Sequence, residues 1–139
     1  MREKTLHLLG LMRRANAIAV GETNTGSTAR AGKAQLLVLA SDASENARRR
    51  AEGFAAGREA PLITLPFTKE EIASSVGLSG GSMAAITDAG FAAALLKALA
   101  EEEPERYGAA AEEMRRRFEC QRANAQVRTK RIGKRRTNV

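Results

Sequence analysis

The chain has 139 residues, which is enough for one domain with its own hydrophobic core but too few for two independently stable ones. Hydrophobic residues make up 43% of it, yet no apolar run approaches the roughly 20 residues that a membrane helix needs. The single cysteine, Cys120, cannot form an internal disulfide, and the N-terminus lacks the apolar core of a secretion signal. We therefore expect a cytoplasmic protein with no membrane segment, and a monomer.

The net charge of +7 is concentrated at the C-terminal end. Residues 120–139 contain seven basic residues and no acidic one, so the remaining chain has 23 − 7 = 16 basic residues against 16 acidic ones. Lysine and arginine tracts attract polyanions by counterion release, and nucleic acid is the commonest polyanion of the cytosol. A tail that only keeps the protein soluble is the alternative. The predicted phosphate contacts in the tail are Arg128, Lys130, Arg131, Lys134, Arg135 and Arg136.

The first half of the chain alternates helical and strand patterns. Apolar residues at near-helical spacing predict a helix over residues 3–15, followed by a short strand over 17–20. A second helix is predicted from residue 22 to about Gly32, weakened by Gly26. The unbroken apolar run at 36–40 is typical of a central strand that is covered on both faces.

The second half continues the alternation. Residues 41–44 offer helix N-caps for a helix from 45 to about 56, with its three consecutive arginines toward solvent. A strand lies between two prolines at 61–66, and Thr68 with Glu71 forms a capping box for a helix that ends near Gly77. A strand at 83–87 and a helix over 89–100, capped by Asp88, complete the pattern. These elements predict a three-layer α/β/α sandwich with a mixed four-stranded sheet.

The acidic segment at 101–105 is predicted to be a domain boundary. Pro104 is expected to interrupt the helix there, so residues 1–103 are predicted to form the domain and residues 104–139 a charged helix with a basic tail. The helix is predicted over 108–125. The segment from 127 onward has little to bury, and we expect it to stay disordered until it meets an anionic partner.

No catalytic, metal-binding or cofactor-binding motif is recognisable. His7 is the only histidine and lies inside the first predicted helix, and Cys120 has no histidine near it in sequence. Residues 21–28 join a strand to a helix, as a phosphate loop does, but lack its Gly-Lys-Ser/Thr ending. We therefore expect no metal, no cofactor and no enzymatic activity; the free backbone N–H groups at that helix start remain suited to a phosphate or a base edge.

Five stretches of the chain resemble the kink-turn-binding ribosomal proteins of the large-subunit seven-Ae and thirty-e type, and in particular their bacterial YlxQ branch. The order and spacing of these stretches agree from about residue 6 to residue 99. They are LLGLMRRAN at 8–16, Gly-Glu at 21–22, RAGKA at 30–34, LVLASDASEN at 37–46 and AITDAGFA at 85–92. The resemblance implies the same α/β/α sandwich and RNA binding.

The resemblance also implies a site. In the family, the helix start after the first strand enters a bent RNA through a Gly-x-Asn-Glu-x-x-Lys signature, with help from the loop before the last strand. In this chain Ser27 stands where the lysine is usual and Gly81 where the YlxQ branch often has arginine, so two phosphate contacts are absent. The predicted RNA-binding residues are Gly21, Glu22, Thr23, Asn24, Ser27, Arg30, Lys33, Asp42, Ser82 and Met83.

Together these observations predict a ribosome-associated RNA-binding protein that recognises a bent, kink-turn-like RNA, with ribosomal proteins as further candidate partners. One alternative is a module in which the tail binds RNA or other polyanions without specificity and the domain serves as an adaptor for protein partners. A second alternative is an enzyme, which would need a cofactor loop or a catalytic pair; a pocket with converging carboxylates would support it.

Overall fold

A computed structural model describes residues 2–57, 60–77 and 82–137, with side chains described from residue 3 to residue 124. Four strands form one sheet in the order β1-β4-β2-β3. Their bounds are Ile18–Val20 for β1, Leu36–Leu39 for β2, Leu62–Thr64 for β3 and Met83–Ile86 for β4. β4 is antiparallel to β1 and β2, whereas β3 is parallel to β2. The sheet is therefore mixed, as predicted, and the apolar run at β2 lies inside it.

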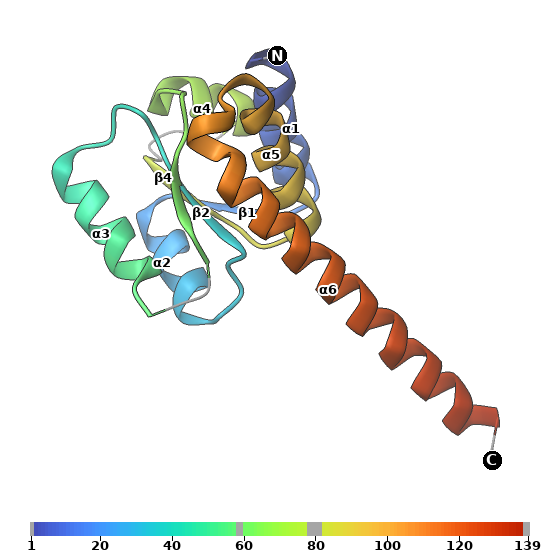
Figure 1. Cartoon of the computed structure of the whole chain (residues 1–139). Helices are drawn as coiled ribbons and strands as arrows, with labels where there is room; N and C mark the ends of the chain where they lie inside the picture. Colours follow the sequence, from blue (N-terminus) through green and yellow to red (C-terminus); the bar gives the residue numbers. More distant parts are fainter. Residues whose placement is uncertain (1, 58–59, 78–81, 138–139) are drawn as a thin grey trace.

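Helices cover both faces of this sheet (Figure 1). One layer contains α1 (Arg2–Arg14), α4 (Lys69–Val76) and α5 (Ala89–Glu102), and the other contains α2 (Glu22–Arg30) and α3 (Glu45–Ala55). The predicted caps of three helices are confirmed, with Ser44 capping α3, Asp88 capping α5, and Thr68 forming a capping box with Glu71 at α4. The three-layer sandwich is confirmed.

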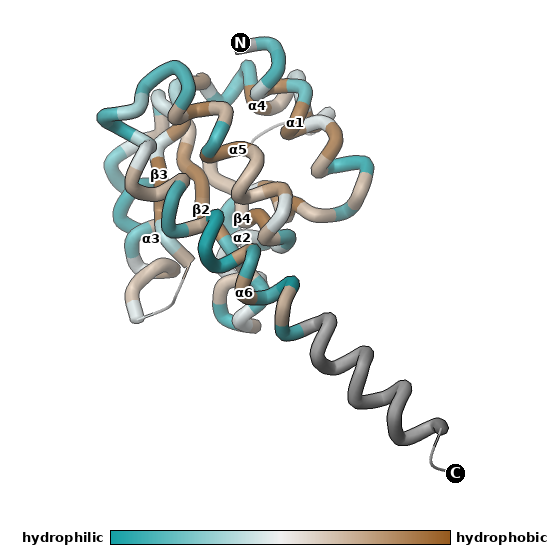
Figure 2. Tube along the Cα trace, turned by 45° about the vertical axis from the view of Figure 1, so that its right-hand side comes forward, coloured by the Kyte–Doolittle hydropathy of each residue, from teal (hydrophilic) through white to brown (hydrophobic). Residues whose placement is uncertain are grey.

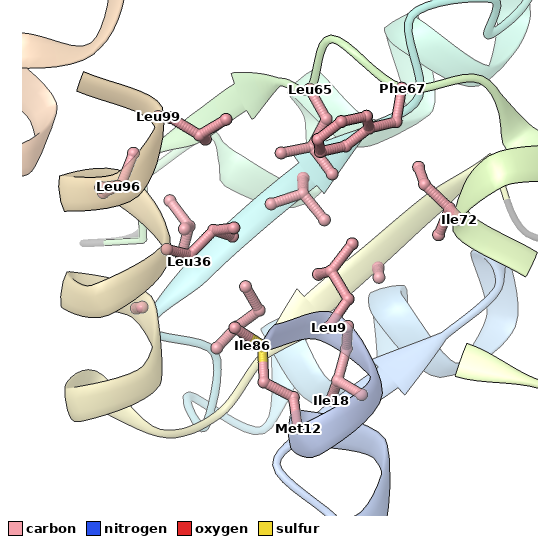
Figure 3. Close-up of a cluster of buried hydrophobic side chains, with 14 of the residues drawn as sticks. Leu9, Met12, Ile18, Leu36, Leu65, Phe67, Ile72, Ile86, Leu96 and Leu99 are labelled. Atoms are coloured by element: carbon pink, nitrogen blue, oxygen red, sulfur yellow. The ribbon is translucent and has the colours of Figure 1, made fainter. Parts of the chain in front are cut away.

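The main core lies between the sheet and the layer of α1, α4 and α5 (Figure 3). Alternate residues of β2 point to opposite faces, so Leu36 and Val38 join this core while Leu37 and Leu39 pack toward α2 and α3. Hydrophobic colours mark the central strands and hydrophilic ones the outer helices in Figure 2. A strand that is covered on both faces has no polar side, which explains the unbroken apolar run.

The last helix, α6 (Pro104–Thr137), differs from the prediction at both ends. It begins at Pro104 rather than at 108, because proline is well tolerated at the first helical position, where its missing N–H costs nothing. It also continues to Thr137, where the sequence predicted no regular structure. Alanine, glutamine, arginine and lysine favour helix in this stretch, and no proline follows Pro104.

The core does not stop at residue 103. α6 packs against α5, and its Tyr107 and Met114 are buried in the main core. The Tyr107 hydroxyl donates a 2.7 Å hydrogen bond to the carbonyl oxygen of Thr64, the last residue of β3. The first part of α6 therefore completes the fold, so that a chain cut at residue 103 would expose apolar surface on α5.

Candidate nucleic-acid interface

One end of the sheet gathers several of the predicted site residues. Gly21 follows β1, and its N–H donates to the Met83 carbonyl oxygen at 3.0 Å. The N–H of Ala40, at the end of β2, donates to the Ser82 carbonyl oxygen at 2.8 Å. Because β4 runs antiparallel to both β1 and β2, its beginning meets their ends. The start of α2 and the residues that open β4 are therefore neighbours, as the resemblance implied.

The first turn of α2 offers backbone donors to a ligand. Gly21 is the N-cap and, as a glycine, provides no side-chain acceptor for the first N–H groups of the helix. Its φ of 98° lies in the left-handed region, which favours glycine over residues that carry a Cβ. An exposed helix start of this kind attracts anions through its N–H groups and its partial positive charge.

Asn24 is held in position next to this helix start. Its Nδ2 donates a 3.0 Å hydrogen bond to the carbonyl oxygen of Val20, the last residue of β1. The side chain is exposed, and its Oδ1 remains an acceptor. Thr23 and Ser27 are exposed on the same short helix, so the predicted polar residues of α2 face solvent together with Asn24.

Arg50 of α3 also belongs to this region, although no sequence pattern pointed to it. Its Nη1 lies 2.6 and 2.8 Å from the two carboxylate oxygens of Glu22. Both side chains are about half exposed, at 59% and 43%, so the ion pair contributes about 0–1 kcal/mol to stability. It nevertheless neutralises Glu22 beside the α2 start. The two residues are 28 positions apart, and no local pattern connects them.

Three other predicted residues have different surroundings. Oδ1 of Asp42 accepts a 2.9 Å hydrogen bond from the Lys69 N–H, so this carboxylate holds the start of α4. Met83 is buried in the core, and its carbonyl oxygen already accepts the hydrogen bond from Gly21, so this predicted site residue is not exposed to a ligand. Ser82 is half-buried and keeps its place beside the end of β2.

The basic residues of the RAGKA stretch are not brought to the α2 start. Arg30 ends the nine-residue helix, and nine residues span about 13 Å. Its guanidinium carbon lies 6.0 Å from the centre of the Phe54 ring, over the α3 side of the molecule. Lys33 follows beyond and is exposed. Gly81 lies outside the described residues, as do the side chains of the predicted tail contacts.

Gly26 proves to be a packing requirement. It is buried, and a Cβ at this position would lie 2.7 Å from the Cζ atom of Phe54. The absence of a side chain allows α2 to approach α3 closely. The expectation that Gly26 only weakens the helix is therefore incomplete, because the same residue fixes how the two helices pack.

Glu112 and Glu119, two carboxylates of α6, share one arginine. Arg115 bonds to Glu112 and, at 2.8 Å, to Glu119. The hydrogen bond and the charge of Arg115 lower the pKa of Glu112, and both carboxylates raise the pKa of Arg115. A carboxylate held ionised in this way is a poor proton donor. Among the described residues, no group of histidine, cysteine and acidic side chains could hold a metal ion, and no helix could cross a membrane.

Comparison with known proteins points in one direction. The Ribosomal protein L7Ae/L30e/S12e/Gadd45 family matches residues 3–96. A protein named RNA-binding protein YlxQ from Enterococcus faecium is 34% identical over 91 residues, which are 66% of this chain and 86% of that protein. Among solved structures, a protein of unknown function from Bacillus halodurans C has a TM-score of 0.61 and 25% identity, covering 66% of this chain and 92% of the other. The Giardia lamblia 15.5kD RNA binding protein has a TM-score of 0.50 at 20% identity, covering 59% and 69% of the two chains, and shows the same fold.

Proposed function

The chain belongs to the Ribosomal protein L7Ae/L30e/S12e/Gadd45 family, and on that premise we propose that it binds RNA and recognises a bent, kink-turn-like element with the start of α2 and the neighbouring opening of β4. We propose further that it acts as a cytoplasmic monomer associated with the ribosome, where ribosomal proteins are candidate partners. Its relative in Enterococcus faecium carries the name of an RNA-binding protein.

The observation that carries the proposal is the convergence at one end of the sheet. The uncapped N–H groups after Gly21, the fixed amide of Asn24 and the backbone at Ser82 all lie there. A bent RNA exposes base edges and closely spaced phosphates, and such N–H groups and amides bind both. A straight A-form duplex has a deep, narrow major groove that does not admit side chains to the base edges.

The charge distribution suggests that the domain and the basic tail contribute differently to RNA binding. Ser27 carries no charge, and the Arg50 guanidinium is paired with Glu22, so the α2 start reads shape and base edges more than it attracts phosphate. The seven basic residues of 120–139 hold the whole net charge of the chain. We infer that the domain supplies specificity and the tail supplies much of the affinity.

The same distribution of charge supports one rival function, in which the tail alone binds RNA and the domain is an adaptor for proteins. If the tail alone binds RNA, binding should disappear when the tail charges are removed, and bent and straight RNAs should bind equally well.

Titration of the full chain with a kink-turn RNA and with a straight duplex of equal length separates the two functions. The proposal predicts tighter binding of the kink-turn RNA, and a preference that persists when the basic residues beyond 127 are changed to glutamine. Glutamine substitutions are preferable to truncation at residue 103, because Tyr107 and Met114 belong to the core. Equal affinity for the two RNAs would contradict the kink-turn proposal.

A further inference from the structure

A groove runs beside the α2 start, along the edge strand β1. Its volume is about 310 Å³, and its lining includes Arg13 and Asn16 from the end of α1 and Asn24 and Ser27 from α2. All three residues of β1 also line it, and β1 contacts both α1 and α2. Ligand pockets are commonly about 300–1,000 Å³, so the groove is large enough for one small polar ligand.

We propose that this groove binds an unpaired nucleotide of the RNA next to its bend, with Arg13 on the phosphate and the amides of Asn16 and Asn24 on the base edge. The proposal rests on the proposed function and extends it to a second part of the surface. Asn24 belongs to both parts, since it lies at the α2 start and also lines the groove.

Arg13 is the charged residue in the lining of the groove. Its side chain is exposed, and it forms no ion pair with any carboxylate in the described part of the chain. Arg50, by contrast, is already paired with Glu22. Ser27, on the facing wall, carries no charge. A phosphate in the groove would therefore meet a guanidinium that is not engaged by a carboxylate, and guanidinium–phosphate contacts are among the stronger charge-assisted hydrogen bonds.

The turn after α1 places Asn16 at the rim of the groove. The N–H of Ala17 donates to the Met12 carbonyl oxygen at 2.8 Å, and the N–H of Asn16 donates to that of Arg13 at 3.2 Å. These two bonds form a Schellman motif, in which Asn16 adopts a left-handed conformation with φ 57°. Its exposed amide has two donors and an acceptor, enough to read a base edge.

Arg14 provides a matched control. It has the same charge, lies in the same last turn of α1 and is also exposed, but it lines a different hollow together with His7 and Ser75. Any general effect of positive charge, including its interaction with the helix C-terminus, is shared by the two arginines. Only a direct contact in the groove distinguishes them.

The test compares Arg13→Gln, Arg14→Gln and Asn16→Gly in the full chain, by titration with the kink-turn RNA over a range of salt concentrations. Glycine at position 16 keeps the left-handed turn while removing the amide. We expect Arg13→Gln to weaken binding roughly ten-fold and to reduce the salt slope by about 0.7–0.9, as for the loss of one phosphate contact. Asn16→Gly should weaken binding without changing the slope, and Arg14→Gln should stay within about two-fold of the wild type.

Equal losses for Arg13→Gln and Arg14→Gln, or no loss for either, would overturn the groove proposal while leaving the kink-turn preference of the wild type intact. Absence of that preference in the wild type would overturn the proposed function and the groove with it. Thermal unfolding of each variant shows whether the fold is preserved, and both arginine variants should unfold within about 0.5 kcal/mol of the wild type.

Discussion

Replacing Gly26 with alanine tests how closely α2 packs against α3. A Cβ at position 26 would lie 2.7 and 2.9 Å from two Phe54 ring atoms and 3.3 Å from a guanidinium nitrogen of Arg30. Phe54 is packed against the buried clusters around Leu37 and Leu39 on this face of the sheet. The clusters hold the ring on one side, so an added Cβ forces the Phe54 ring, α2 or both to shift.

The expected change in the free energy of unfolding of Gly26→Ala combines two opposing effects. Alanine is better than glycine inside a helix by about 1 kcal/mol, whereas overpacking a filled space costs about 1–3 kcal/mol. Gly26→Ala should therefore lower the free energy of unfolding by about 0–2 kcal/mol. Gly53→Ala is the control, because Gly53 lies in α3 with nothing within 4 Å of an added Cβ. It should raise the free energy of unfolding by about 1 kcal/mol.

Urea unfolding followed by circular dichroism measures both changes. Because Glu22 pairs with Arg50 across the same helix pair, a displaced α2 should also bind the kink-turn RNA more weakly in Gly26→Ala but not in Gly53→Ala. Equal stabilisation of the two alanine variants would mean that the close approach of α2 to Phe54 does not constrain the fold.

Three other changes have defined outcomes. Tyr107→Phe removes the hydrogen bond to Thr64 and should cost about 1 kcal/mol in urea unfolding. Burial raises the pKa of Tyr107, so its contribution is complete below the ordinary tyrosine pKa of about 10 and is lost as the pH rises through the higher pKa of the folded state; this alkaline loss should be smaller in Tyr107→Phe. Asn24→Ala removes the bond to Val20 and should weaken kink-turn binding several-fold, as measured by titration, while costing about 1 kcal/mol of stability; unchanged affinity would remove Asn24 from the interface. Glutamine at the six tail positions should reduce the salt slope of RNA binding by up to about 5, and an unchanged slope would mean that the tail does not touch phosphate. These positions are Arg128, Lys130, Arg131, Lys134, Arg135 and Arg136.

The sequence was most informative where structure is local. The caps at Ser44, Thr68 and Asp88 depend on residues three positions apart, and all three were predicted. The run at β2 was predicted as an interior strand because its hydrophobicity lacks alternation. Pro104 was misjudged because proline has opposite effects at the start and in the interior of a helix, and the sequence alone did not fix which position it holds.

The site was less predictable because it depends on contacts between distant segments. The resemblance pointed to the α2 start and the opening of β4, which the antiparallel pairing of β1 with β4 does bring together. Arg50 could not be found in this way, since its pairing with Glu22 depends on how α2 and α3 pack. Gly26 was seen only as a weak helix residue, because its contact with Phe54 is likewise tertiary.

Backbone amide chemical shifts, followed while kink-turn RNA is added to the full chain, show directly which residues the RNA contacts. If the domain recognises the RNA, the largest changes will fall on Gly21, Asn24, Ser27 and Ser82, with smaller changes in the basic tail. Changes confined to residues 120–139, with none in the first turns of α2, would contradict recognition by the domain and support binding by the tail alone.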